Sequence, residues 1–434
     1  MEGKKFVGIC SDDGSRAVVN ANPWEQRKLG ELVKEGILEA PLDGNHGEKH
    51  PTSDEYVESG IPFLMASDIH NGEVNIYSCK YITKERAERL DKGFARNGDV
   101  LLTHKATIGE TAILSNLMTE YAMLTPQVTY YRIKNEERLN REYLYSFFNS
   151  LDFQTELKTK AAQSTRPYIG ITAQQNLKII LPTEIDEQRK IGLYFGNLDR
   201  LITLHQRKCD EVKSLKKYML QKMFPQNEQK VPEIRFEGFT EAWDQRKLGD
   251  LVDRVTRKNQ DLVSELPLTI SAQYGLIDQN EFFDKRVASK DVSGYYLIEN
   301  GEFAYNKSTS TDAPWGAIKR LDRYENGVLS TLYIVFGIKE NNPVDSDFLV
   351  SYYSTNLWHK GIHEIAAEGA RNHGLLNIAP ADFFETKLMI PQDIEEQKKI
   401  GKYFEELERL ITLHQQKCEE LKKIKKFMLQ KMFV

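Results

Sequence analysis

One segment near the end of the chain carries the residue types of a metal-dependent nuclease. Asp382, Glu385 and Lys387 place two carboxylates and a lysine close together, a combination that can hold a divalent cation and stabilise developing negative charge. The segment directly precedes the strand-like run 388–390. The chain consists of two similar halves, as described below, and the corresponding segment of the first half, residues 175–178, has no carboxylates. We therefore interpret these residues as the solvated start of a strand.

Motifs for other DNA chemistry are incomplete or missing. An adenine-N6 methyltransferase needs an Asn/Asp-Pro-Pro-Tyr/Phe motif, but Asn22-Pro23-Trp24 and Asn342-Pro343-Val344 lack the second proline. The sequence contains no Gly-x4-Gly-Lys-Ser/Thr loop for ATP. The histidines lack ligand partners at the spacing of a metal site: His104, His205, His359 and His373. The sequence therefore predicts a protein that is not itself an enzyme and that uses no metal or cofactor.

Polar and basic side chains gather instead in two predicted loops of each half. Base recognition in DNA uses Arg, Lys, Asn, Gln, Ser and Thr on loops that can enter a groove, supported by contacts to phosphates. The candidate DNA contacts of the first half are His104, Lys105, Thr107, Gln163, Ser164, Thr165, Arg166 and Tyr168. Those of the second half are Lys307, Ser308, Thr309, Ser310, Arg371, Asn372 and His373.

Basic residues recur at matching places in these loops. Lys105 aligns with Lys307 and Arg166 with Arg371, while their neighbours differ. This pattern predicts shared phosphate contacts beside base contacts that are specific to each half. The alternative is that these are ordinary exposed polar loops. A third candidate site consists of Asp68, His70 and Asn71.

Composition limits the class of protein. The chain has 434 residues, of which 40% are hydrophobic and 28% charged, as in soluble proteins of two to four domains. The net charge of −5 disfavours a stand-alone DNA clamp, because neutralising phosphates requires clustered Lys and Arg. Four scattered cysteines without a CxxC pair, no secretory signal and no apolar run that could span a bilayer predict a cytoplasmic protein.

The elements that position the loops are encoded twice. Residues 200–205, Arg-Leu-Ile-Thr-Leu-His, recur at 409–414, and residues 219–224, Met-Leu-Gln-Lys-Met-Phe, recur at 428–433, both shifted by 209 positions. Each half also opens on Trp-x-Gln-Arg-Lys-Leu-Gly, at Trp24 and at Trp243. Between these anchors the halves diverge. The chain is therefore an internal duplication with two variable inserts.

The repeated tracts predict two long helices that form a coiled coil. Their heptad seam consists of Ile191, Leu198, His205, Val212 and Met219, and of Ile400, Leu407, His414, Leu421 and Met428. An adjacent row consists of Tyr194, Leu201, Lys208 and Leu215, with Tyr403, Leu410, Lys417 and Ile424 in the copy. A helix of this length extends roughly 58 Å. Antiparallel pairing is expected, because it places one globular domain at each end and brings His205 near His414. The alternative is that each helix lies along its own domain.

The repeats also predict the order of domains. We expect an α+β fold in which two α/β domains are separated by an antiparallel coiled coil of two long helices, with an internal pseudo-twofold repeat. The predicted boundaries are 1–182 for the first globular domain, 183–224 for the first helix, 225–242 for a linker, 243–391 for the second globular domain and 392–434 for the second helix.

This organisation resembles the specificity subunits of type I restriction-modification systems. The resemblance rests on the two Trp-x-Gln-Arg-Lys-Leu-Gly openings, the Leu-Pro and Ile-Pro pairs at 181–182 and 390–391, and the Glu-Gln-x-Lys-Ile-Gly helix starts at 187 and 396. The segment 231–240 adds to it, whereas residues 1–22 are less typical.

The resemblance implies a function as well as a fold. Each globular domain would be a target recognition domain for one half of a bipartite, asymmetric sequence in double-stranded DNA. The helices would act as a spacer and as a docking surface for two methyltransferase subunits, to which endonuclease/translocase subunits can be added. The alternative is a coiled-coil scaffold with two protein-binding domains, which would bind no DNA even with a methyltransferase present.

Overall fold

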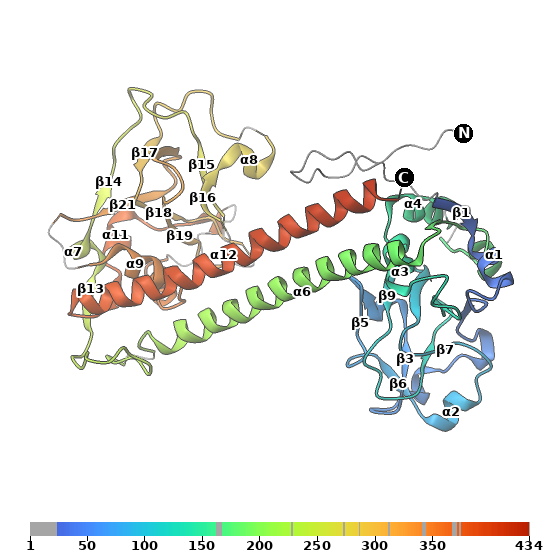
Figure 1. Cartoon of the computed structure of the whole chain (residues 1–434). Coiled ribbons are helices and arrows are strands. Elements are labelled where there is room, and N and C mark those ends of the chain that lie inside the picture. Colours follow the sequence, from blue (N-terminus) through green and yellow to red (C-terminus); the bar gives the residue numbers. More distant parts are fainter. Residues whose placement is uncertain are drawn as a thin grey trace, which may run out of the picture. The chain divides into compact units, whose positions relative to one another are not determined.

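The computed structural model describes residues 24–161, 167–226, 229–271, 274–285, 287–310, 313–340, 344–366, 371–372 and 375–433. The chain divides into two compact units. Unit 1 comprises residues 1–206 and 416–434, and unit 2 comprises residues 207–415. Each unit contains one mixed α/β domain, which we call a head, and parts of both long helices (Figure 1).

The head of unit 1 contains two four-stranded sheets, ordered β6-β3-β10-β7 and β2-β11-β8-β9. Their strands are β2 Leu42–Asp43, β3 Ile61–Leu64, β6 Lys80–Ile82, β7 Phe94–Ala95, β8 Val100–Lys105, β9 Thr107–Ile113, β10 Ala122–Leu124 and β11 Val128–Tyr131. A short hairpin is formed by β4 Ile69–His70 and β5 Glu73–Val74. The helices are α1 Leu29–Lys34, α2 Lys84–Glu88, α3 Arg141–Phe148, α4 Leu151–Ala161 and α5 Ile171–Gln174.

The start and end of this head are paired directly. Strand β1, Trp24–Lys28, runs antiparallel to β12, Lys178–Pro182, with Trp24 opposite Pro182. Helix α6, Ile185–Lys222, follows β12. Helix α3 begins where the side chain of Asn140 accepts a hydrogen bond from the Tyr143 amide at 2.8 Å, a standard N-cap.

The head of unit 2 repeats the second of these sheets in the order β14-β21-β18-β19. Its strands are β13 Asp244–Lys247, β14 Val252–Val255, β15 Leu268–Ser271, β16 Gly275–Asp278, β17 Tyr296–Glu299, β18 Phe303–Asn306, β19 Ala317–Arg320, β20 Asn326–Leu329, β21 Ile334–Ile338, β22 Arg371–Asn372, β23 Leu375–Leu376 and β24 Lys387–Ile390. The helices are α7 Leu248–Leu251, α8 Gln279–Phe283, α9 Ser346–Tyr353, α10 Trp358–Ile365, α11 Pro380–Phe384 and α12 Ile394–Lys431.

The nuclease-like segment lies at the exit of this head. Lys387 is the first residue of β24, which pairs with β13. Glu385 forms an ion pair with Lys247 at 2.7 Å. Lys387 agrees with the interpretation of the segment as the start of a strand, whereas Asp382 lies in α11, Pro380–Phe384, and Glu385 caps the end of that helix.

The two long helices are equal in length, at 38 residues each, and they run antiparallel within each unit. In unit 1, Cys418 Sγ lies 4.0 Å from the Ile202 carbonyl oxygen, and Lys425 pairs with Asp199. In unit 2, the repeat-related contacts are Cys209 Sγ to the Ile411 carbonyl oxygen at 4.0 Å and Lys216 to Glu408. In both units the residue numbers of the contacting pairs increase along one helix as they decrease along the other. The predicted antiparallel pairing is confirmed.

The adjacent row of the predicted seam is wrong by one position. Tyr194, Leu201 and Leu215 are exposed on α6, and Ile424 is exposed on α12. The row that packs beside the seam consists of the residues that directly follow the predicted ones. Except for Ile202, which is half-buried, its members are buried: Phe195, Ile202 and Cys209, with Phe404, Ile411 and Cys418 in the copy.

The segment predicted as a linker contacts the start of α12. Arg235 donates to both carboxylate oxygens of Glu396, at 2.6 and 2.8 Å. The ring of Phe236 packs edge-on against Tyr403 at a centroid distance of 6.2 Å. The described part of this segment therefore adds to the core of unit 2 as well as joining the two heads.

Candidate nucleic-acid interface

The first candidate loop of unit 1 is the end of a β-hairpin. Strands β8 and β9 continue to their tip, where Lys105 pairs with Thr107. Ala106 makes the turn in a left-handed conformation, with φ of 68°, which is uncommon for a residue other than glycine. The first loop predicted for this half, which contains His104, Lys105 and Thr107, is therefore mostly strand, and the prediction of a loop is wrong in its secondary structure. The side chains of Lys105 and Thr107 are exposed at the tip.

The structure brings this tip together with the second candidate segment. The Ile169 amide donates to the His104 carbonyl oxygen at 3.2 Å, and Lys105 forms a β-bridge with Tyr168. The Lys105 ammonium lies 6.0 Å from the centroid of the Tyr168 ring. Lys105, Thr107 and Tyr168 thus belong to one surface. The other candidates of this segment, Gln163, Ser164, Thr165 and Arg166, lie outside the described residues.

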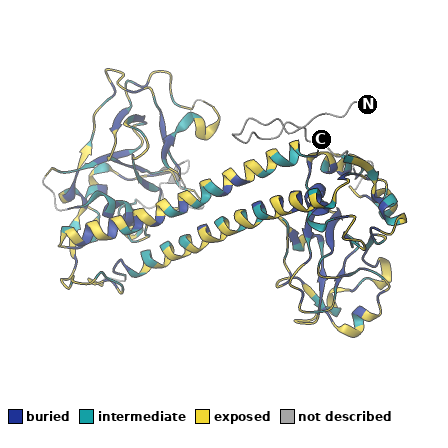
Figure 2. Cartoon of the chain, in the orientation of Figure 1, coloured by how far each residue is buried: buried dark blue, intermediate teal, exposed yellow. Residues whose placement is uncertain are grey.

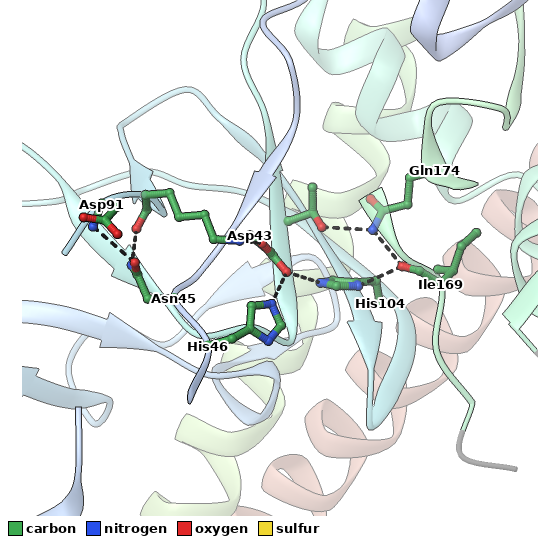
Figure 3. Close-up of polar contacts among 9 residues, drawn as sticks. Asp43, Asn45, His46, Asp91, His104, Ile169 and Gln174 are labelled. Carbon is green, nitrogen blue, oxygen red and sulfur yellow. Dashed lines mark hydrogen bonds and ion pairs between the residues drawn. The ribbon is translucent and has the colours of Figure 1, made fainter. Parts of the chain in front are cut away.

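His104 does not belong to that surface. Its side chain is 0% exposed, and its Nδ1 lies 2.9 Å from the Ile169 carbonyl oxygen. Its Nε2 lies 3.9 Å from the Asp43 carboxylate (Figure 3). Burial lowers the pKa of His104, because a desolvated imidazole resists protonation. We therefore remove His104 from the candidate DNA contacts and assign it to holding residue 169 in place.

A second buried side chain holds the same carbonyl. Gln174 Nε2 donates to the Ile169 carbonyl oxygen at 3.0 Å and to Thr129 Oγ1 at 3.1 Å. Its Oε1 accepts from the Tyr131 hydroxyl at 2.7 Å. Because a buried polar group is costly to leave unpaired, this network fixes the segment beside the hairpin tip (Figure 3).

Asp43 is a functional candidate that the sequence did not reveal. Its carboxylate is buried and contacts His46 Nε2 at 2.9 Å and the Lys92 ammonium. Burial alone would raise its pKa, but hydrogen bonds and charge from Lys92 and His46 outweigh burial and lower the pKa. Lys92 and His104, which both approach this carboxylate, are far from Asp43 in the sequence, which is why no local motif indicates it.

The corresponding surface of unit 2 lies after β18. The Leu376 amide donates to the Lys307 carbonyl oxygen at 3.0 Å, so the loop that starts at Lys307 runs beside β23. Ser308, Thr309 and Ser310 follow in this loop, and the Ser308 amide donates to Asn306 Oδ1 at 3.0 Å. Burial lowers the pKa of Lys307.

The second candidate segment of unit 2 is described in part. Arg371 and Asn372 form β22, whose backbone pairs with β23. His373 lies outside the described residues. As in unit 1, the segment that carries the second set of candidates adjoins the end of the central hairpin.

Strand register corrects one predicted equivalence. Val100 pairs with Tyr131 in unit 1, and Phe303 pairs with Phe336 in unit 2. When Val100 is matched with Phe303, Lys307 matches His104. The hydrogen bonds agree with this match, because the Ile169 amide donates to the His104 carbonyl oxygen and the Leu376 amide donates to the Lys307 carbonyl oxygen. The alignment of Lys307 with Lys105 is therefore wrong by one residue.

The three residues of the third candidate site have different surroundings. The Asp68 carboxylate accepts from the Met65 amide at 2.7 Å and caps the turn Ala66–Asp68. Burial raises the pKa of Asp68. His70 and Asn71 are exposed on the β4–β5 hairpin, and the Asn71 amide donates to the Glu110 carboxylate of β9 at 3.3 Å. Asp68 is thus engaged within the fold, and the other two side chains remain candidates.

Two kinds of feature are absent from the residues that the structure describes. Within them, no group of three or more His, Cys, Asp or Glu side chains is placed to hold a metal ion. Among the helices that the structure describes, none is long and apolar enough to cross a membrane.

Each head is followed by one of two long helices of equal length, and each head carries one of two matched surfaces. These features define a duplicated protein. The chain belongs to the family of the type I restriction modification DNA specificity domain, whose model matches residues 22–214 and 240–423. The family predicted from the repeated motifs is confirmed.

Relatives are similar over part of their length. The chain is 23% identical over 201 residues to the type I restriction enzyme MjaVIII specificity subunit of Methanocaldococcus jannaschii, covering 45% of this chain and 44% of that protein. It is 23% identical over 195 residues to the EcoBI specificity subunit of Escherichia coli, covering 44% and 38%. Each match therefore spans less than half of the relative.

One solved structure shares the fold over nearly the whole chain. The type I restriction-modification S subunit from M. genitalium matches with a TM-score of 0.60 at 14% identity, covering 96% of this chain and 98% of that one. The predicted α+β architecture, with two heads and a pair of long antiparallel helices, is confirmed.

Proposed function

We propose that this chain recognises a bipartite, asymmetric sequence in double-stranded DNA and directs methyltransferase subunits to it. The observation that carries the proposal is the pair of matched surfaces. In both heads the end of the central hairpin adjoins a second segment through an equivalent backbone hydrogen bond. The side chains on the two surfaces differ, which suits recognition of two different half-sites.

The chain itself would perform no chemistry. It would act in the cytoplasm, where the DNA and the partner subunits are available. Its net charge of −5 leaves the chain short of the positive charge that phosphate binding requires. We therefore infer that tight binding needs the partner subunits.

The exposed apolar side chains of the long helices support docking of two methyltransferase subunits. They occur in repeat-related pairs, Leu204 with Leu413, Leu215 with Ile424 and Tyr218 with Phe427, along helices whose exposed residues run over their whole length (Figure 2). Exposed apolar patches mark protein interaction sites. Two equivalent patches would seat two copies of one subunit, and endonuclease/translocase subunits would join that complex.

Binding measurements with and without the methyltransferase test the proposal. The chain alone is expected to bind duplex DNA weakly and without preference, and the co-purified complex to bind one split sequence tightly. A coiled-coil scaffold with two protein-binding domains would instead show no DNA binding in either case. Sequence-specific binding by the methyltransferase without this chain would also contradict the proposal.

A further inference from the structure

Both heads contain a further segment at the same place in the fold. Leu42 pairs with Tyr130 in unit 1, and Val255 pairs with Val335 in unit 2. By the strand register described above, Tyr130 and Val335 are equivalent positions of β11 and β21. The segments that follow Leu42 and Val255, residues 43–50 and 256–263, are therefore equivalent, and we call them the third segments.

In each third segment, the side chain of a buried asparagine forms hydrogen bonds with the backbone of a neighbouring part of the chain. Asn45 Nδ2 donates to the Lys92 carbonyl oxygen at 2.7 Å, and its Oδ1 accepts from the Asp91 amide at 3.1 Å (Figure 3). Asn259 Nδ2 donates to the Ser264 carbonyl oxygen at 2.8 Å, and its Oδ1 accepts from the Ser264 amide at 3.1 Å. These bonds fix the backbone from which the exposed side chains of each segment project.

The third segments adjoin the surfaces already proposed to bind DNA. In unit 1, Asp43 lies 3.9 Å from His104, one residue before Lys105. In unit 2, Lys258 forms a β-bridge with Tyr296, and its ammonium lies 3.9 Å from the centroid of the Tyr296 ring. Val335, which pairs with Val255, also pairs with Ala304 of β18, so the third segment leaves the sheet at the same end at which Lys307 follows β18.

The exposed side chains of the two segments differ in kind. His46 is exposed in unit 1, with Nε2 at 2.9 Å from the buried Asp43 carboxylate. This contact orients the ring and leaves Nδ1 as an acceptor in the neutral form. Gln260 is exposed in unit 2, next to the buried Asn259. A glutamine amide can donate to and accept from the major-groove edge of adenine.

We propose that the third segments contribute base contacts, with His46 acting on one half-site and Gln260 on the other. Asp43 is a positioning residue that orients His46. This inference rests on the proposed function and adds specificity-determining residues to it. A common frame with different exposed side chains is what recognition of two unlike half-sites requires.

The test uses the complex with methyltransferase subunits. The target is first mapped from the sites that the wild-type complex methylates, and initial methylation rates are then measured on duplexes with one base changed at a time. The variants are His46→Ala and Gln260→Ala. Glu136→Ala and Glu340→Ala serve as controls, because both residues are exposed beyond the far ends of β11 and β21.

His46→Ala should reduce discrimination at a position of one half-site, and Gln260→Ala at a position of the other, each by roughly tenfold or more. Gln260→Glu should shift the preference at its position from adenine towards cytosine, whose amino group can donate to a carboxylate. The control variants should match the wild type, and thermal unfolding should show that all variants fold.

Unchanged discrimination in both alanine variants would overturn the inference, as would a uniform loss of rate on every duplex. Failure of the proposed function would look different, because methylation by the wild-type complex would then show no dependence on this chain.

Discussion

The ring of Phe433 packs against Trp24 with a centroid distance of 6.4 Å and an interplanar angle of 61°. The end of the second long helix therefore completes the core of the unit in which the chain begins. Phe224 packs against Trp243 at 5.9 Å in the repeat-related position of unit 2. Each long helix thus starts in one unit and ends in the core of the other.

Loss of the Phe433 ring should destabilise unit 1. Phe433→Ala removes a buried ring that contacts Tyr143, Phe147 and Phe195 as well as Trp24, and such a change costs about 3–5 kcal/mol. Hydrogen exchange should show loss of protection in the first head.

Phe427→Ala is the matched control on the same helix. Phe427 is 57% exposed, so its removal should change the free energy of unfolding by less than about 0.5 kcal/mol. Equal effects of the two substitutions would contradict the packing described for the end of α12.

The antiparallel register can be trapped as a disulfide. In a chain whose other cysteines are replaced by serine, Ile202→Cys should crosslink to Cys418 on oxidation, because Cys418 Sγ lies 4.0 Å from the carbonyl oxygen of residue 202. Peptide mass spectrometry of the oxidised chain identifies the link. Leu204→Cys, at an exposed position, should form no such link. A second chain carries Ile202→Cys and Ile411→Cys, with every natural cysteine replaced by serine, and a crosslink between these two positions would instead indicate parallel helices.

Burial of His104 should make the stability of unit 1 depend on pH. Desolvation lowers the pKa of His104 in the folded chain below its usual value of about 6.5. The unfolded chain therefore binds more protons as the pH falls through that value, so the free energy of unfolding decreases on acidification.

Urea unfolding at two pH values, one above and one below the usual histidine pKa, measures this effect. His104→Gln, which keeps a hydrogen-bonding side chain without a titrating group, should show a smaller difference between the two conditions than the wild type. An equal difference in both proteins would show that His104 does not contribute.

Lys105 should contact phosphate rather than a base. Lys105→Ala should weaken binding of the methyltransferase complex to all sequences about equally and reduce the slope of log affinity against log salt by about 1. Binding titrations at several salt concentrations, on the target and on an unrelated duplex, measure both quantities. A loss confined to the target would instead indicate a base contact.

The sequence predicted the features that depend on local or repeated patterns. The duplication is visible because residues 200–205 and 409–414 are identical, and a heptad pattern sustained over each tract indicates a long helix. The second row of the seam could not be chosen in this way. Tyr194 and Phe195 are adjacent aromatic residues, and only the packing of the fold shows that Phe195 is the buried one.

The candidate site was harder to predict because its contacts are distant in the sequence. His104 is polar and precedes a lysine, which is typical of an exposed loop, but its partner Ile169 lies 65 residues away. Asp43 belongs to no motif, and its role follows from the fold that places it beside His104 and Lys92.

The proposed function is tested most directly by mapping every methylated base in DNA exposed to the methyltransferase with and without this chain. We predict methylation only when the chain is present, at one motif with two specified half-sites separated by a fixed number of unspecified bases. Arg166→Ala should relax one half-site and Arg371→Ala the other. The same methylation without the chain, or a single uninterrupted motif, would contradict recognition of a bipartite sequence by this chain.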